Sequence, residues 1–325
     1  MKKNWIAKVA VLMLALTMIT SCFVGSTFAK YITKAEGTDT ARVAKWGILL
    51  TVSGNAFDYH YKTHETEDAY GYDGKYSVEA LSEEDRLVAP GTSSADFDDN
   101  LVATVKGKPE VATRYTLTAE KVEDVVLPAG TYTDYTQLVK ADDGTYGYTG
   151  TFELKQAYTP VKWNLLITKG TTEFNVAEDL YTALSAHPDL LQKAEALGFS
   201  KKGCSIFSAI EILKKVAPSD TYTQVVETAL GNVVSGGRNF QLDIDDEGKL
   251  VMSYDFDPNK EMDFTFELTW AWEFSDAEGQ YDITLNDQAD TYLGNIAAEV
   301  DGIVVPDGAS VKIAANLTAT ATQID

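Results

Sequence analysis

The sequence predicts an antiparallel β-sandwich that carries an inserted group of short helices. Most of the chain beyond about residue 40 alternates apolar and polar residues with the period of two that is typical of half-buried strands. One stretch in the middle, residues 176–230, instead shows helical spacing. The chain has 325 residues, of which 45% are hydrophobic and 11% aromatic, so it is long enough to bury a sizeable core.

The expected strands are rich in Val, Thr, Tyr, Phe and Leu. Before the helical stretch they are Ala41–Ser53, Asp96–Lys106, Val111–Val122, Thr151–Gln156 and Val161–Thr168. After it they are Phe240–Ile244, Lys249–Phe256, Met262–Phe274 and Val311–Thr322. The acidic turn at residues 245–248 predicts a hairpin between the first two strands of this second set. In Met262–Phe274 the large apolar residues share one face, which must therefore be buried.

The helical stretch is expected to pack on the sandwich as an insertion. Leucines recur at helical spacing from Leu180 to Leu197, Gly198 supplies a stop, and the period returns over residues 206–216. Since no linker rich in Pro, Gly or Ser flanks the stretch, an insertion at about 176–230 is favoured over a separate helical domain. A further short helix is expected at residues 287–300.

The first 29 residues have the pattern of an export signal. Three lysines precede an apolar core at residues 9–19, and Thr27-Phe28-Ala29 offers small residues for cleavage between Ala29 and Lys30. Two alternatives remain open: a retained membrane anchor, and a lipobox at residues 19–22 in which Cys22 is lipidated. The expected organisation is a signal at 1–29, an extended segment at 30–40, and one sandwich domain at 41–325.

The charge of the chain restricts its partners. Cleavage after Ala29 removes three of the 27 basic residues and none of the 49 acidic ones, which changes the formal net charge from -22 to -25. Such a charge repels nucleic acid and anionic membranes and favours basic partners or divalent cations. Cys204 is then the one remaining cysteine, so no intrachain disulfide is expected, and a buried apolar role is favoured for it.

No catalytic or metal site is predicted. His60 and His64 are four residues apart, but Tyr61 stands where a zinc peptidase needs glutamate, so the Tyr-rich stretch 57–76 is interpreted as an exposed irregular loop. Asp243, Asp245, Glu247 and Gly248 imitate half of an EF-hand loop, yet Tyr254 stands at the position of the bidentate acid. We therefore expect no cofactor, apart from weak calcium binding at the acidic surface. His187, which precedes Pro188, is expected at a helix end.

Several motifs resemble the TasA/camelysin-like proteins, and in particular their clostridial branch. The motifs are Gly25–Tyr31, Thr40–Trp46, Val88–Ser93, Gly107–Val111, Leu268–Phe274 and Ala289–Gly294. The resemblance implies a jelly-roll-like sandwich, export by a dedicated signal peptidase in Gram-positive bacteria, and assembly into fibres of a biofilm matrix. Some members are labelled metallopeptidases, but this chain lacks the His-Glu-x-x-His motif.

In such a fibre each subunit donates an N-terminal strand to the next copy. The candidate donor residues are Lys30, Tyr31, Ile32, Thr33, Lys34 and Ala35, with residues 38–40 as a hinge. The expected partners are other copies of the chain, the signal peptidase during export, and other matrix components. Two alternatives stay open: a monomeric cell-surface adhesin that binds through residues 57–76, and an exported metallopeptidase.

Overall fold

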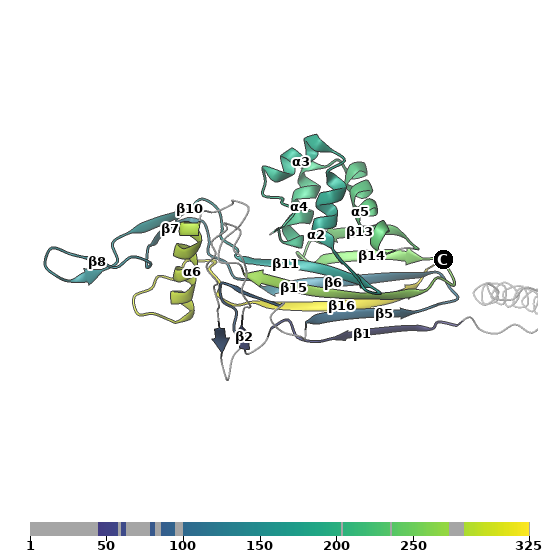
Figure 1. Cartoon of the computed structure of the whole chain (residues 1–325), viewed down its shortest axis with the longest axis horizontal. Coiled ribbons are helices and arrows are strands. Elements are labelled where there is room, and N and C mark those ends of the chain that lie inside the picture. Colours follow the sequence, from purple (N-terminus) through teal and green to yellow (C-terminus); the bar gives the residue numbers. More distant parts are fainter. Residues whose placement is uncertain are drawn as a thin grey trace, which may run out of the picture. The chain divides into compact units, whose positions relative to one another are not determined.

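The computed structural model describes residues 45–57, 60–62, 79–81, 86–94, 100–202, 204–234, 236–272 and 283–324. The chain divides into two compact units, residues 1–45 and 46–325, and the second unit is the one described below. This unit is dominated by strands that pair in antiparallel sheets (Figure 1). The fold class expected from the alternating pattern is confirmed at this level.

The first large sheet has the order β1-β5-β15-β11-β12. Its strands are β1 (Ile48–Ser53), β5 (Leu101–Gly107), β15 (Met262–Trp272), β11 (Val161–Lys169) and β12 (Thr172–Asn175). The short strand β4 (Thr92–Ser93) pairs with the end of β15. The long strand β15 lies in the middle because its alternating aromatic face supplies much of the core.

The second large sheet has the order β13-β14-β6-β16. Its strands are β13 (Gly237–Ile244), β14 (Leu250–Phe256), β6 (Thr113–Glu123) and β16 (Ala314–Gln323). The turn at residues 245–248 joins β13 to β14, and both N–H groups of Glu247 and Lys249 donate to Asp245 Oδ1 at 2.9 Å. The predicted hairpin at this position is therefore confirmed.

The core lies between the two sheets and is built largely from aromatic side chains. Tyr115 on β6 stacks on Phe266 of β15 with ring centroids 5.2 Å apart, and Tyr254 of β14 lies 5.2 Å from Tyr115. Trp163 and Trp270 are also fully buried, and the indole N–H of Trp270 donates to Ala56 O at 2.6 Å. Each fully buried apolar side chain contributes roughly 1.5–3 kcal/mol of hydrophobic stabilisation, so this face dominates the energetics of the sandwich.

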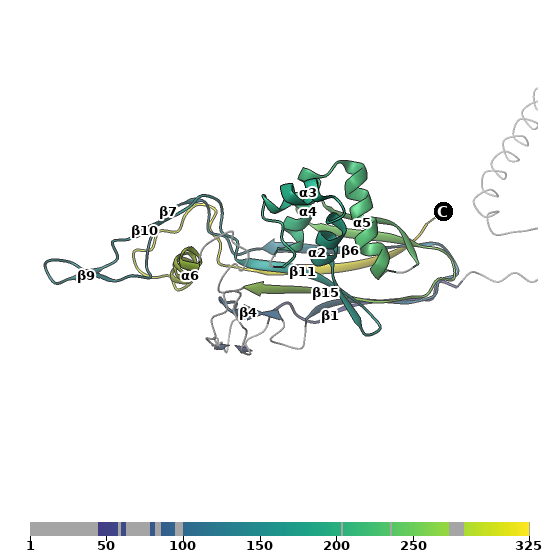
Figure 2. The same ribbon diagram turned by 45° about the horizontal axis from the view of Figure 1, so that its top comes forward.

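Four helices fill the stretch between β12 and β13. They are α2 (Val176–Leu184), α3 (Pro188–Glu195), α4 (Ile206–Val216) and α5 (Ser219–Val233). Asn175 caps α2 through its side chain, and Pro188 occupies the first turn of α3, where its missing N–H costs nothing. The helices pack on β11 and β13, and both views show them on one side of the sandwich (Figures 1 and 2).

At one end of the sandwich, a ribbon and a helix extend the structure. The ribbon pairs β7 (Gly130–Thr133) with β10 (Thr151–Leu154), and then β8 (Val139–Lys140) with β9 (Tyr146–Gly147). Helix α6 (Ile283–Ala297) packs beside the base of the ribbon (Figure 1). Asp290 of α6 fixes it to the sandwich, since its Oδ1 accepts from Tyr158 OH at 2.8 Å and from Trp272 Nε1 at 3.2 Å.

The structure changes several expected boundaries. Stretch 57–76 was expected to be irregular, but His60–Lys62 forms strand β2, which pairs with β3 (Glu79–Leu81). The expectation was wrong there because three residues are too few to show a period. The strands expected to begin at Asp96 and Val311 are observed from Leu101 and Ala314, and the expected helix at 287–300 is observed at 283–297. The ribbon strands β7, β8 and β9, and the strand β12, were not expected.

Candidate functional site: the open seam between β1 and β16

A sandwich of two sheets has two seams, at which the edge strands of the two sheets face each other. At one seam the first sheet ends in β11 and β12 and the second sheet ends in β13. Helices α2, α4 and α5 pack on these strands, and α3 packs on α2 and α4. At the other seam β1 and β16 lie near each other without pairing. In the part of the chain that the structure describes, β1 pairs only with β5 and β16 only with β6, so each has one main-chain edge outside a ladder. We call this the open seam.

Strand β1 brings apolar side chains to the open seam. Ile48 and Leu50 are half-buried against the core, while Leu49 is 61% exposed and Val52 is 43% exposed. The first residues of β1 approach the end of β5 closely. A Cβ at Gly107 would lie 2.2 Å from Gly47 O, and Gly107 has φ +148°, so this approach requires glycine. Exposed apolar groups on an edge strand are unusual and suggest a surface that another segment covers.

Strand β16 brings small side chains to the same seam. Its sequence alternates alanine and threonine after Leu317, with Ala319 and Ala321 half-buried and the threonines between them mostly exposed. The two alanines lie opposite Leu117 and Tyr115 of β6. Neither β1 nor β16 contains a charged residue or a proline, and the one register shift of β16 is at its first two residues. Within the described residues, both edges thus lack the charges, prolines and mid-strand bulges that often prevent pairing with another chain.

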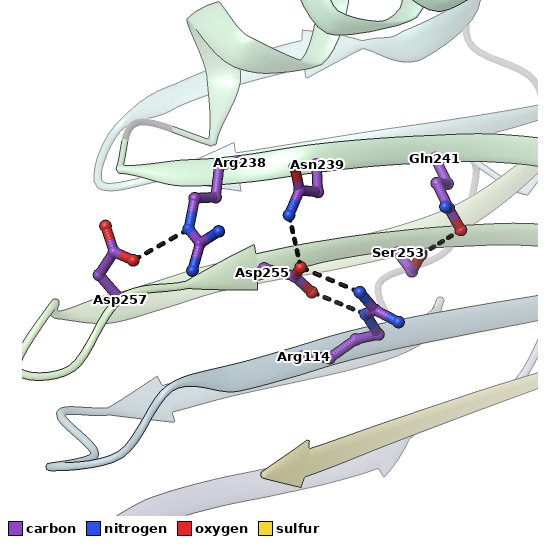
Figure 3. A network of polar contacts seen from close by, with 7 residues as sticks. All are labelled: Arg114, Arg238, Asn239, Gln241, Ser253, Asp255 and Asp257. Atoms are coloured by element: carbon purple, nitrogen blue, oxygen red, sulfur yellow. Dashed lines mark hydrogen bonds and ion pairs between the residues drawn. The ribbon is translucent and has the colours of Figure 1, made fainter. Parts of the chain in front are cut away.

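We call the seam that is covered by the helices the closed seam. There, the edge strand of the second sheet has a feature that hinders pairing with another chain. Strand β13 has a register shift between Arg238 and Gln241, where Asn239 adopts φ 54°. Figure 3 shows the polar network that holds this irregular edge. A bulge of this kind bends the strand and interrupts its row of main-chain groups.

The centre of the network is Asp255 on β14, whose side chain is 2% exposed. Its carboxylate accepts two hydrogen bonds from Arg114, at 2.7 and 3.0 Å, and one from Asn239 Nδ2 at 2.9 Å (Figure 3). The hydrogen bond from Arg114 lowers the pKa of Asp255, although burial acts in the opposite direction. Arg238 and Asp257 form a second ion pair at 2.9 Å, and Ser253 donates to Gln241 at 3.4 Å.

The predicted donor segment lies outside the described residues. This applies to Ala29, Lys30, Tyr31, Ile32, Thr33, Lys34 and Ala35, and also to Cys22 and His64. In the sequence, this segment is followed by Trp46 and then by β1, which starts at Ile48.

The other residues singled out in the sequence have structural roles. His187 is the N-cap residue of α3, and Cys204 is buried with its thiol 3.6 Å from Ser205 O. Asp243 forms an ion pair with Lys214, while Asp245 closes the hairpin turn. Among the described residues, no group of three or more His, Cys, Asp or Glu residues could hold a metal ion.

The position of β16 at the edge of its sheet was not predicted from the sequence. The sequence pattern that could have indicated it is the alternation of alanine and threonine in Leu317–Thr322. This run has the period of a strand, small side chains and no charge. That this strand ends a sheet depends on pairing between residues far apart in the chain, such as Ala319 with Leu117.

Comparison of the chain with family models, with curated proteins and with solved structures gives no match. In the described residues no helix has both the length and the apolar character needed to cross a membrane.

Proposed function

We propose that the protein is a secreted, non-enzymatic structural subunit of an extracellular biofilm-matrix or cell-surface fibre. Each copy donates its N-terminal segment, with Lys30–Ala35 as the pairing residues, to the open seam of the next copy. The observation that carries this proposal is the pair of uncharged, proline-free edges at β1 and β16. The jelly-roll form of the sandwich, which the family resemblance implies, belongs to the same proposal.

The main-chain groups of an added strand have partners at this seam. An extended segment that pairs with β16 satisfies the free edge of the second sheet and places alternate side chains between the sheets. The half-buried Ala319 and Ala321 leave more room beside the core than larger residues would. In the donor segment Tyr31, Thr33 and Ala35 share one face, and Ile32 and Lys34 share the other.

The geometry of donation favours a chain of subunits over a closed pair. The donor precedes β1 in the sequence, whereas the acceptor edge includes β16 at the other end of the chain. A contact between two different surfaces of the same protein is heterologous, and when it does not close into a ring it generates a filament.

The donor half of the proposal is tested by electron microscopy of the chain from Lys30 onward. Ile32→Pro removes a main-chain donor and is expected to abolish fibres while the monomer stays folded, whereas Ile32→Val is expected to assemble normally. Deletion of residues 30–38 is expected to act like the proline, and a peptide of residues 30–37 added in trans is expected to cap monomers. Normal fibres from the deletion variant would overturn donation by this segment.

The acceptor half is tested by two neighbouring residues of β16. Ala319 faces the seam and Thr320 faces solvent, so Ala319→Lys places a charge where the donated strand packs and Thr320→Lys does not. Fibres are expected to be lost with the first substitution and kept with the second. Equal assembly of both variants would exclude β16 as the acceptor edge.

A further inference from the structure

Exposed apolar side chains are concentrated in two segments at the end of the sandwich that carries α6 and the ribbon. Residues 138–148 form the tip of the ribbon, and residues 299–307 belong to the loop after α6. Seven of the twelve exposed large apolar side chains among the described residues lie in these segments, and Val304 is 70% exposed. The seven are Leu138, Val139, Tyr146, Tyr148, Val300, Val304 and Val305. Because single exposed apolar residues are normal but groups of them mark interaction sites, we call the two segments together the ribbon-end surface.

The two segments of the ribbon-end surface have a common support. Tyr148 packs on Tyr135 with ring centroids 5.1 Å apart, and Tyr135 lies 5.7 Å from Tyr292 of α6. The hydroxyl of Tyr292 donates to Val304 O at 2.7 Å, which fixes the loop to the same aromatic cluster. Both views show the ribbon beside α6 at this end (Figures 1 and 2). The tip and the loop therefore present their apolar groups on one supported surface.

The tip of the ribbon has main-chain groups that an added strand could use. Strands β8 and β9 contribute two residues each and, within the described part of the chain, pair only with each other. A two-stranded hairpin alone is marginally stable in water, whereas three strands with an apolar face can be stable. Residues 138–148 contain no proline, so nothing in this stretch removes a main-chain donor. An extended segment on either edge would stabilise the tip and cover its apolar side chains.

The charges of the ribbon-end surface are almost all negative. Its five exposed acids are Asp142, Asp143, Glu299, Asp301 and Asp307. None of these acids forms an ion pair with a base among the residues that the structure describes. Thr145 donates to Asp143 from its hydroxyl at 2.6 Å and from its N–H at 2.9 Å, and these bonds lower the pKa of Asp143.

Few bases offset these acids. Lys140 is the one base within the two segments, and its ammonium group lies over the Tyr146 ring, 5.6 Å from the centroid. The next exposed bases along the chain at this end, Lys155 and Lys312, are matched in number by the exposed acids Glu153 and Asp287. The surface thus combines apolar contact area with an excess of negative charge.

This combination restricts what can bind. A second copy of this strongly acidic chain, a nucleic acid or an anionic membrane would be repelled by the five acids. A basic segment is attracted to them, and its apolar side chains can cover the exposed tyrosines and valines. We propose that the ribbon-end surface is a docking surface for an extended segment of another protein that is rich in basic and apolar side chains. The surface lies outside the open seam, so this inference does not depend on strand donation.

The first test is the affinity for a defined probe, measured by fluorescence anisotropy. The probe is a short labelled peptide of alternating lysine and valine, and its counterpart has glutamate in place of lysine. The protein is the chain from Lys30 onward with Ile32→Pro, so that fibre assembly does not compete. The lysine peptide is expected to bind and the glutamate peptide is not. Equal binding of the two peptides would overturn the proposed chemistry of the partner.

Variants of the surface then locate the binding. Tyr146→Ser and Val304→Ser are each expected to raise the Kd of the lysine peptide about tenfold, the change that a loss of roughly 1.4 kcal/mol produces. Asp301→Asn is expected to raise the Kd less and to weaken its dependence on salt, because salt screens exposed charges.

Two matched controls lie in the helical stretch. Leu197 is 41% exposed and Asp220 is an exposed acid, so Leu197→Ser and Asp220→Asn remove groups of the same kinds away from the ribbon. Both controls are expected to bind like the parent chain. If the surface variants bind no more weakly than these controls, the peptide is attracted only by the net charge and the docking surface is wrong.

The second test is hydrogen exchange of the same chain. The lysine peptide is expected to slow exchange of amides in residues 138–148 and to leave α3 unchanged, since an added strand gives the edge amides partners. Exchange is also measured as the protein concentration rises and with vesicles of phosphatidylcholine and phosphatidylglycerol. Protection of the ribbon tip by concentration or by vesicles, without protection by the peptide, would assign the surface to a second copy or to a membrane and overturn the proposal.

Discussion

At the closed seam, β13 and the β11–β12 edge lie under four helices, whereas at the open seam β1 and β16 face each other with no described helix packed on them. The closed edge also has a bulge, whose Asn239 bonds to the buried Asp255 of the neighbouring strand, and the open edges have neither charge nor proline. Since both seams belong to the same two sheets, the difference cannot come from the demands of the core. Among the described residues, the open seam is the less covered of the two.

At the closed seam, the helices bury the apolar side chains completely. Leu180, Leu184, Ile210 and Leu213 are all fully buried between the helices and the sheets. The half-buried Ile48, Leu50 and Ala319 occupy the equivalent inner positions at the open seam. An added strand at the open seam would complete the burial that α2–α5 complete at the other side.

We expect the largest effect when alanine is replaced by lysine at each seam and the free energies of unfolding are compared. Ala209 of α4 is fully buried, so Ala209→Lys places an unpaired charge in the core and is expected to cost at least about 3 kcal/mol. Ala319→Lys can direct its ammonium group to solvent at the open edge and is expected to change the free energy of unfolding by less than about 1 kcal/mol. Urea unfolding of the two monomeric variants measures both values. Equal destabilisation would mean that the open seam is as tightly packed as the closed one.

Much of the difference between the two seams could not be predicted from the sequence. Alternation predicted β6, β11, β14 and β15, and the helical period predicted the cover over 176–230, because each pattern is local and long enough to repeat. Sheet order is not local: β1, β5 and β15 are neighbours although Phe266 and Ala103 are far apart in the chain. The two-residue strands β8 and β9 are too short to show any period. The donor segment Lys30–Ala35 stays a prediction.

Asp290 of α6 is expected to make stability depend on pH. It fixes α6, whose following loop leads into β16, and burial raises its pKa to about 7 although Tyr158 and Trp272 donate to it. A carboxyl with a raised folded pKa weakens the fold as pH rises from about 4 to about 7, because only the unfolded chain ionises freely in that range. Asp290→Asn is expected to gain on the order of 2–4 kcal/mol relative to the parent chain between pH 4 and pH 8.

Urea unfolding of both chains at the two pH values gives this difference, and the comparison across pH cancels the effect of the amide itself. Asp301→Asn is the matched control, since Asp301 is an exposed acid in the loop that follows the same helix. A relative stability of Asp290→Asn that does not change with pH would show that Asp290 is ionised in the folded protein throughout this range.

Asp255 at the closed edge is expected to show the opposite dependence with a smaller amplitude. Arg114 lowers its pKa, so its contribution to stability is present above the ordinary carboxyl pKa and is lost as pH falls through the lower folded value. Asp255→Asn is expected to cost about 1–3 kcal/mol at pH 7, since it weakens the bonds to Arg114 and Asn239, and less at pH 3. The matched control is Asp257→Asn, because Asp257 forms an exposed pair with Arg238 and is expected to change stability by less than about 1 kcal/mol. If the cost of Asp255→Asn is the same at both pH values, the ion pair does not hold the bulged edge, and the helices alone protect the closed seam.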